Sequence, residues 1–433
     1  MNFAHLRHLT QRIAMAGDSV AIVHIYSEYP DYGWVDASEE GISCVDDVAR
    51  AAVLYLRYAQ LTGDRRVLPQ AKAYLRFLLH MQRPDGLFYN FIRRDGSINR
   101  RGRTSKASFD WWAVRGYEAL AYGIRAFAKE DSAFSARLRR AFLLCRKPLA
   151  RVLSNYPRKI LWSGKSYPAW LVHETAADAS AVLLHALTLF LQIQPDAELQ
   201  AAALRLAEGI RAMQLPDTSR FPGLFLSFRD LWHAWGNIQA YALAAFGQIQ
   251  AGDSLAAAAR FEARAFLPRL LLGNWFAEYY VSRDSLVRFP QIAYGVRCAA
   301  LGALAVYRSS GEVRYARLAG LLASWLTGNN PAGQPLYDPG TGRGYDGVTD
   351  SLRINRNAGA ESTIETLRTL VEIQAVPEAR AFLMARFTGK SRVQEVSGWG
   401  RSAVRPFVVP GRGGWQLVYS LNKKDFRILR ESQ

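Results

Sequence analysis

The chain has little cysteine and no long apolar segment. Its 433 residues hold three cysteines, Cys44, Cys145 and Cys298, which are scattered and odd in number. This argues against a disulfide framework and favours a reducing compartment, so we predict a cytoplasmic protein. No apolar run approaches the roughly 18–20 residues of a membrane span. The N-terminus lacks the apolar core of a signal peptide. We therefore expect no membrane partner.

Lysine is also scarce. Nine lysines stand against 46 arginines, and the chain carries a net charge of +18. The arginines are spread along the chain, and no basic run alternates with aromatic residues as a platform for single-stranded nucleic acid requires. We predict no nucleic-acid partner, whereas an anionic sugar remains open as an explanation of the charge.

Motifs for cofactors and metals are missing as well. Residues 342–347 match G-x-G-x-x-G, but no strand precedes them and no βαβ unit surrounds them, so no dinucleotide is expected. His5 and His8 lack a third ligand, so they predict no metal site. Neither a G-x-S-x-G sequence nor a P-loop occurs. We expect neither a cofactor nor a metal.

A helical hairpin is repeated along the chain. Residues 46–61 and 67–81 show apolar positions at three-to-four spacing, Gly63 stops the first helix, and Pro84 follows the second. A single hairpin cannot bury its apolar faces, and five further copies follow it. The first helices of the six hairpins start near residues 46, 110, 174, 233, 292 and 359.

Six hairpins with short inner turns and long connections close naturally into a ring. We predict an all-α fold, an (α/α)6 toroid over residues 46–390, preceded by a short helix and an aromatic loop over residues 1–45. Residues 391–433 predict a small β-rich tail packed on the toroid. Long loops on a rigid scaffold usually carry function, so the site is expected on the face of the long connections.

Acidic residues gather at the helix starts on that face, and capping explains some of them. The capping-box spacing, Ser or Thr three residues before an acid, ends at Asp46, Asp178 and Glu365. We predict caps at Asp178 and Glu365, whereas Asp46 could instead pair with Arg50 one turn on. The acids that this pattern leaves unexplained are Asp47, Asp110, Glu174 and Glu361.

Aromatic and amide residues accompany these acids in the long connections. Aromatic rings suit the apolar faces of a sugar, and paired carboxyl groups suit glycoside hydrolysis, in which one donates a proton and the other activates water or attacks. We predict Asp47 and Asp110 as the acid/base pair, with Glu361 as the alternative partner. The predicted substrate-binding residues are Trp34, Asp46, Tyr89, Asn90, Arg103, Trp111, Trp112, His173, Glu174, Trp232, His233, Tyr345 and Asn357. The expected partner is an oligosaccharide or another glycan, and Arg103 could bind an acidic group on it.

The hairpin unit carries a family resemblance. Its Thr-Gly-Asp turn at residues 62–64 and its Met-Gln…Asp-Gly-Leu-Phe exit at residues 81–88 resemble the six-hairpin glycosidase superfamily. Residues 44–51, CVDDVARA, also resemble the CxDDxARA motif of bacterial toroid proteins, some of which are fused to glycosyltransferases. Residues 340–350 and 355–367 resemble the closing part of that group. The resemblance spans about residues 40–390, implies that Asp46, Asp47 and residues 357–361 face a sugar cleft, and allows a functional link to a glycosyltransferase.

Three hypotheses about function remain open, because this superfamily hosts several reactions. The first is a glycoside hydrolase that uses the paired carboxyl groups. The second is a sugar epimerase or isomerase in which His173 and His233 transfer the proton. The third is a non-catalytic glycan-binding partner of a glycosyltransferase, in which the acids only bind hydroxyl groups.

Overall fold

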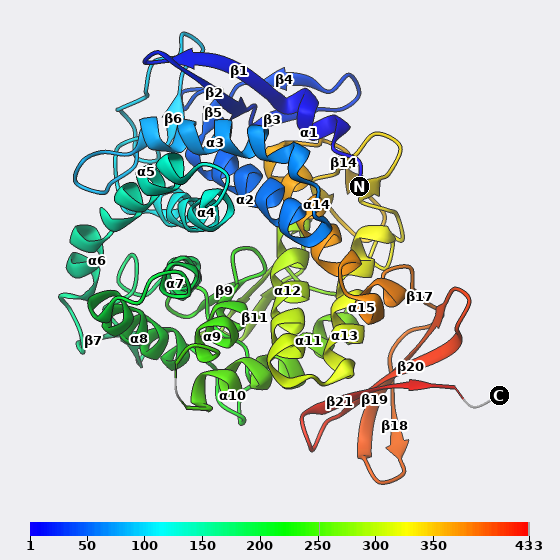
Figure 1. Ribbon diagram of the computed structural model, residues 1–433. Coiled ribbons are helices and arrows are strands. Elements are labelled where there is room, and N and C mark those ends of the chain that lie inside the picture. Colours follow the sequence, from blue (N-terminus) through cyan, green and yellow to red (C-terminus); the bar gives the residue numbers. More distant parts are fainter. Residues whose placement is uncertain (251, 432–433) are drawn as a thin grey trace.

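The computed structural model describes residues 1–250 and 252–431, and its helices form two concentric layers (Figure 1). The inner helices are α2 (Val45–Thr62), α4 (Trp111–Phe127), α7 (Ala177–Leu191), α9 (Gln239–Gly247), α12 (Ala293–Ser310) and α14 (Ala360–Gln374). The outer helices are α3 (Leu68–Met81), α5 (Ser132–Leu143), α6 (Arg146–Leu153), α8 (Ala197–Ala212), α10 (Ser254–Phe261), α11 (Leu267–Leu272), α13 (Val313–Ala323) and α15 (Pro377–Phe382). Among the described residues, no helix combines the length and apolar character needed to cross a membrane.

The inner helices close into a ring. Each packs against the next in chain order, and α14 packs against α2, so the last inner helix meets the first. Each also packs against an outer helix that follows it in the chain, as α2 does against α3. The predicted helix-rich toroid is therefore confirmed.

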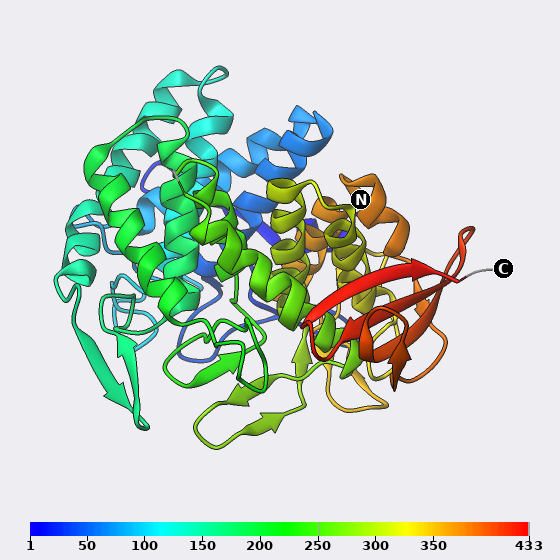
Figure 2. The same cartoon turned by 90° about the horizontal axis from the view of Figure 1, so that it is seen from below.

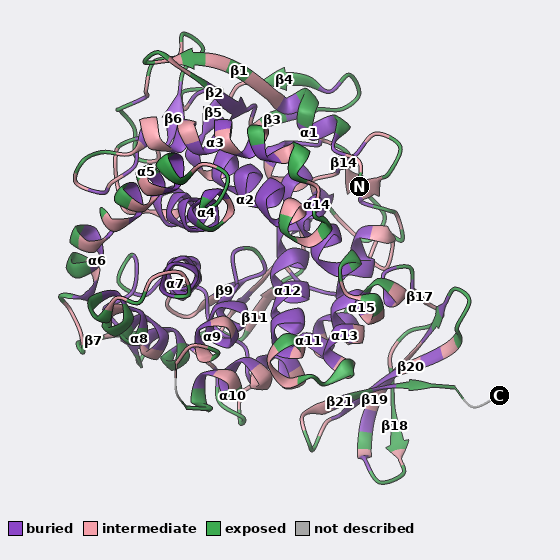
Figure 3. Ribbon diagram, viewed as in Figure 1, coloured by how far each residue is buried: buried purple, intermediate pink, exposed green. Residues whose placement is uncertain are grey.

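Burial separates the two layers (Figure 3). All residues of α7 are buried, whereas α8 buries one face and exposes the other. The inner helices are surrounded by protein, so they do not need a polar stripe, whereas an outer helix shows the apolar face of a surface helix. Helix α2 of the first hairpin ends at Gly63. The φ of this residue, 77°, lies in the left-handed region that favours glycine at a helix end.

Two inner helices begin later than the sequence predicts. The starts near residues 174 and 233 are wrong by a few residues, because the chain is still extended there. Residues 171–176 are held by β-bridges between Leu171 and Glu174 and between Val172 and Ala176, and β9 (Leu231–His233) precedes α9. The Ala-Gly-Asp sequence at residues 251–253 predicts the turn of the fourth hairpin. This turn falls partly outside the described residues, because Ala251 is not among them.

The predicted helix caps at Asp178 and Glu365 are wrong. The N-cap residues of α7 and α14 are Ala176 and Gly359, without a capping side chain. Asp178 and Glu365 are buried and pair instead with His233 and Arg297, which belong to the neighbouring hairpins of the ring. Asp110, which the capping pattern left unexplained, is the N-cap of α4, and its Oδ1 accepts from the backbone N–H of Trp111 at 2.6 Å.

The all-α description holds for the two helical layers only, because the long connections form short antiparallel sheets. Figure 2 shows several of these hairpins along the lower edge, at one end of the helices. The pairs are β5 (Ser43–Cys44) with β6 (Phe91–Ile92), β7 (Lys159–Trp162) with β8 (Lys165–Pro168), β9 with β10 (Glu278–Tyr280) and β11 (Ser285–Val287), β13 (Tyr337–Asp338) with β14 (Arg343–Gly344), and β12 (Gln291–Ile292) with β15 (Gly347–Val348) and β16 (Ile354–Asn355).

Strands also flank the toroid at both ends of the chain. After α1 (Ala4–Leu9), the hairpin of β1 (Thr10–Met15) and β2 (Asp18–Val23) packs on α3, and β3 (Tyr26–Glu28) pairs with β4 (Gly33–Val35). The C-terminal sheet has the order β17 (Arg386–Phe387), β19 (Gly400–Val409), β20 (Gly413–Ser420), β21 (Asp425–Arg430), with β18 (Arg392–Val396) paired to β19. It packs on the outer helices through Trp415, whose ring lies 5.1 Å from that of Phe382. The domain boundaries at residues 45 and 390 stay predictions.

Two helical glycines are expected to respond in opposite ways to alanine. A Cβ on Gly320 in α13 would lie 2.2 Å from the carbonyl oxygen of Ala379 in α15, whereas a Cβ on Gly302 in α12 would meet only ordinary contacts beyond 3.4 Å. Gly320→Ala should lower the free energy of unfolding by about 1–3 kcal/mol through overpacking. Gly302→Ala should raise it by up to about 1 kcal/mol through helix propensity. Urea unfolding measures both, and equal effects would contradict the described packing of α13 on α15.

Candidate active site

A cavity of about 440 Å³ opens on the face of the long connections. The N-terminal turns of α2, α12 and α14 form one side of it, and residues of the long connections form the other. The predicted site residues that line it are Asp46, Asp47, Asn90 and Glu361. Tyr26, Cys44, Phe91, Tyr294, Asp346, Thr349, Asn355 and Ser362 line it as well.

Arg50 contacts three of the carboxyl groups that line this cavity, and its Nε lies 3.4 Å from the carboxyl oxygen Oε1 of the buried Glu365. Its Nη1 donates to Oε2 of Glu361 at 2.5 Å and lies 3.4 Å from Oδ1 of Asp47. Its Nη2 lies 3.5 Å from Oδ2 of Asp46, which confirms the pairing considered from the sequence. Asp46 also accepts a hydrogen bond from Arg115 of α4. Two buried arginines therefore hold the acids of α2 and α14 together.

Asp47 and Glu361 have unequal surroundings. The Asp47 side chain is 7% exposed, and its Oδ2 accepts from the Cys44 thiol at 3.3 Å. Burial raises the pKa of Asp47 to about 7, and the charge of Arg50 only partly offsets this effect. The Glu361 side chain is 42% exposed and ion-paired with Arg50. The Asp47 carboxyl group can therefore hold a proton near neutral pH, whereas Glu361 forms an ion pair.

The charged groups continue below the cavity along the axis of the ring. These ion pairs could not be predicted from the sequence, because each pair joins different helices and no local spacing reveals it. Their side chains are largely buried, and the pairs are Glu365 with Arg297, Glu118 with Arg368 and His185, and Glu372 with Arg57 and Arg308. The inner ring is therefore filled by ion pairs as well as by apolar side chains.

Asp110 and the two predicted histidines lie beside the cavity and do not line it. Nε2 of His173 contacts Oδ1 of Asp110 at 2.8 Å, and this hydrogen bond raises the pKa of His173. His173 and Glu174 both have positive φ values, 48° and 68°, a strained conformation that is often found at functional sites. His233 lies against Asp178, with Nε2 3.0 Å from Oδ2.

An aromatic pair connects this neighbouring group to the cavity. The ring of Trp111 lies 5.7 Å from that of Trp235, which stacks on His233 at 3.7 Å. The guanidinium of Arg115 lies 4.9 Å from the Trp111 ring while it binds Asp46. Trp111 therefore stands between the two groups of polar residues.

The remaining predicted residues are placed elsewhere. Trp112 and Trp232 are buried in the core, where the Trp112 indole donates to the Phe88 carbonyl oxygen at 2.7 Å. Arg103 and Glu174 are exposed. The others support neighbouring loops: Trp34 stacks on His24, Tyr89 lies under the guanidinium groups of Arg83 and Arg100, Asn357 accepts from Tyr29, and the half-buried Tyr345 donates its N–H to Leu336.

Asp346 is the main residue of the cavity that the sequence did not point to, whereas Tyr294 was expected on this face. Asp346 lies inside the glycine-rich stretch 342–347, where Gly347 pairs with Ile292 of β12. Glycine there permits close backbone approach, since a Cβ would lie 2.1 Å from the Gln291 oxygen. The position of Asp346 directly before this glycine was the sequence feature that could have indicated a site residue. Tyr294 accepts from Arg115 at 2.6 Å and completes the base of the cavity.

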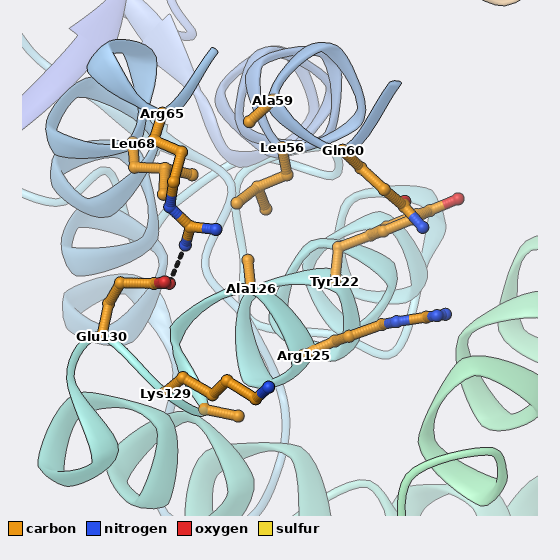
Figure 4. A pocket seen from close by; sticks show the side chains of 11 residues that line it. Leu56, Ala59, Gln60, Arg65, Leu68, Tyr122, Arg125, Ala126, Lys129 and Glu130 are labelled. Carbon is orange, nitrogen blue, oxygen red and sulfur yellow. Dashed lines mark ion pairs between the residues drawn. The ribbon is translucent and has the colours of Figure 1, made fainter. Parts of the chain in front are cut away.

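A second cavity of about 330 Å³ lies where the first hairpins turn (Figure 4). Leu56 and Gln60 of α2 and Tyr122 and Arg125 of α4 contribute to its wall, and Arg65 forms an ion pair with Glu130 across it. None of the predicted site residues lines this cavity. Its basic side chains contrast with the acidic wall of the first cavity.

Comparison with known proteins supports the fold. No protein-family model and no curated protein matches the chain. A sugar epimerase from a ruminal bacterium aligns with a TM-score of 0.57 at 14% identity, over 82% of this chain and 92% of that one. Cellobiose 2-epimerase from Bacillus thermoamylovorans aligns with a TM-score of 0.55 at 13% identity, over 81% and 92%. The family 9 endoglucanase J30 aligns with a TM-score of 0.51 at 14% identity, over 82% and 75%. The chain therefore shares its overall fold with these solved structures.

Proposed function

We propose that this protein is a carbohydrate-active enzyme that hydrolyses glycosidic bonds in the cavity between α2, α12 and α14. The observation that carries the proposal is a pair of carboxyl groups, Asp47 and Glu361, in one cavity but in unequal surroundings. A buried acid with a pKa of about 7 beside an exposed, ion-paired carboxylate suits the two roles of glycoside hydrolysis. The fold shared with sugar-converting enzymes is consistent with it.

Asp47 acts as the general acid in this proposal. Its proton passes to the glycosidic oxygen as the bond to the anomeric carbon breaks, so the leaving sugar departs as a neutral alcohol. Glu361 attacks the anomeric carbon as that bond breaks and forms a glycosyl ester. Water then attacks the same carbon and gives its proton to Asp47, and the bond to Glu361 breaks, which releases the sugar and restores both groups. Asp47 and Glu361 contact the same nitrogen of Arg50 at 3.4 and 2.5 Å, so their nearest oxygens lie within about 6 Å of each other. That spacing supports the retaining rather than the inverting arrangement.

The pH dependence follows from the acid role of Asp47. Its pKa of about 7 means that the proton is present below that pH and lost above it. We expect kcat/KM to fall as pH rises through about 7, with a tenfold loss for each further unit. Initial rates between pH 5 and 9 measure this. A constant rate up to pH 9 would exclude Asp47 as the acid.

The proposed reaction can be tested with a screen of purified protein against neutral, amino-sugar and uronate-containing oligosaccharides. Reducing-end release and sugar isomer composition are followed together. We expect new reducing ends, with Glu361→Gln inactive and Glu395→Gln, an exposed acid of the C-terminal sheet, active as the wild type. Release that persists in Glu361→Gln would remove Glu361 from the mechanism.

A sugar epimerase is the second candidate. The observation in its favour is the contact between His173 and Asp110, since a histidine oriented by a carboxylate can transfer a proton. In that case the same screen yields changed isomers without new reducing ends. His173→Gln would then abolish the change, whereas Glu361→Gln would reduce it only by weakening sugar binding.

A further inference from the structure

The cavity with Asp47 and Glu361 is acidic in a strongly basic protein. Asp46, Asp47, Asp346 and Glu361 line it, and no lysine or arginine is among the lining residues of the described chain. The net charge of +18 is therefore located elsewhere. The lining side chains that can carry a charge at neutral pH are therefore all carboxyl groups.

Asp346 is the acid without a counter-ion. Arg50 and Arg115 lie behind the wall and pair with the acids of α2 and with Glu361. Asp346 accepts instead from the neutral groups Ser362 Oγ and Asn355 Nδ2. No basic side chain of the described residues lies within ion-pair distance of it. Burial raises the pKa of the Asp346 carboxyl group, and no basic side chain in the described part of the chain offsets this effect. The cavity therefore has a carboxyl group whose ionised form lacks a counter-ion.

Most hydrogen-bond donors in the wall of this cavity are already bonded to other groups of the protein. The hydroxyl of Thr349 donates to the Arg353 carbonyl oxygen at 3.2 Å, that of Ser362 donates to Asp346, and the Cys44 thiol donates to Asp47. Asn90 is 5% exposed, its amide nitrogen donates to Thr104, and its Oδ1 is buried away from solvent. The wall thus offers acceptors and has already used most of its donors.

We infer that the substrate of this cavity carries a protonated amino group, as in a glycan with free amino sugars. This inference rests on the proposed function, because it names the substrate class of the same site. An ammonium group has three donors and no acceptor, which matches the carboxylate of Asp346. A uronate would need donors and would face carboxylates of its own sign. Among the described residues, no group of three or more His, Cys, Asp and Glu is arranged to hold a metal ion instead.

The test compares glucosamine, glucose and glucuronate, which differ in charge but not in ring type. Calorimetric titration at pH 6 and low salt is expected to give about tenfold tighter binding of glucosamine than of glucose, and weaker binding of glucuronate. Added salt should weaken glucosamine binding more than glucose binding. Equal binding of all three, binding of none, or a preference for glucuronate would overturn the inference.

A matched pair of variants locates the preference. Asp346→Asn should bring glucosamine binding down to the level of glucose. Asp350→Asn, the same change four residues on at an acid that pairs with Arg353 and does not line the cavity, should keep the preference. A preference that survives in a folded Asp346→Asn protein contradicts the assignment, and the salt dependence tests it in the wild type if that variant fails to fold.

This test is separate from the test of hydrolysis. A preference for glucosamine without cleavage of any glycan would leave the amino-sugar site standing and remove the hydrolase. Cleavage of neutral glycans without a preference for glucosamine would support the hydrolase and remove the amino-sugar site.

Discussion

Replacing Asp47 by asparagine is expected to lower kcat/KM on the cleaved glycan by about 10²–10⁴-fold. Asparagine keeps the shape of the side chain but has no acidic proton for the leaving oxygen. The melting temperature should change little, because the buried Asp47 is already partly protonated near neutral pH. Initial rates and thermal unfolding of the same preparations measure both quantities.

Asp110→Asn is the comparison that separates the two candidate reactions. Asparagine can still cap α4 through its amide oxygen, so the fold is preserved. Since Asp110 does not line the cavity, hydrolysis should fall by less than about tenfold. A larger loss from Asp110→Asn than from Asp47→Asn would contradict the proposed pair and favour the arrangement of Asp110 with His173.

Replacing Glu372 by glutamine is expected to have the largest effect on stability. Glu372 is fully buried, and its two carboxylate oxygens bind Arg57 at 2.6 and 2.8 Å and Arg308 at 2.8 Å. Removing its charge leaves Arg57, itself buried, without compensation, which costs about 3–5 kcal/mol. Urea unfolding measures the loss. Glu378→Gln, at a half-exposed acid of α15 that lies 3.5 Å from Arg317, should lose less than about 1 kcal/mol.

The stabilisation by Glu372 should depend on pH with a defined sign. Burial alone would raise its pKa, but the charges of Arg57 and Arg308 lower it to about 2, from an ordinary value of 4.5. A depressed pKa in the folded state contributes stability that is full above about pH 4.5 and is lost as pH falls toward about 2. The difference between wild type and Glu372→Gln should therefore shrink over that range. A difference that grows on acidification would contradict the ion-pair account.

The helical framework was predictable from the sequence because local patterns determine it. Gly63 ends α2 where the apolar spacing stops, and the other hairpins repeat that unit. The short sheets of the long connections were not predictable, because strands of two residues such as β5 and β6 depend on a partner far along the chain. For the same reason α7 and α9 begin later than expected.

The site was predictable only in part. The location of Asp46, Asp47 and Glu361 on one face followed from the alternation of helix directions, and these residues do line one cavity. The charge partners did not follow, because Glu365 of α14 meets Arg297 of the neighbouring helix α12, and no local sequence spacing reveals this contact. The aromatic residues show the same limit. Trp111 and Trp112 are neighbours in the chain, yet Trp112 is buried in the core and Trp111 is only partly buried against it.

The most direct test of the central claim is a crystal structure of Asp47→Asn bound to the oligosaccharide that the screen selects. We predict a sugar ring in the cavity beside Tyr294, with the glycosidic oxygen within hydrogen-bond distance of residue 47 and the anomeric carbon facing Glu361. An oligosaccharide bound against Asp110 and His173, or in the second cavity near Arg125, would contradict the proposed site.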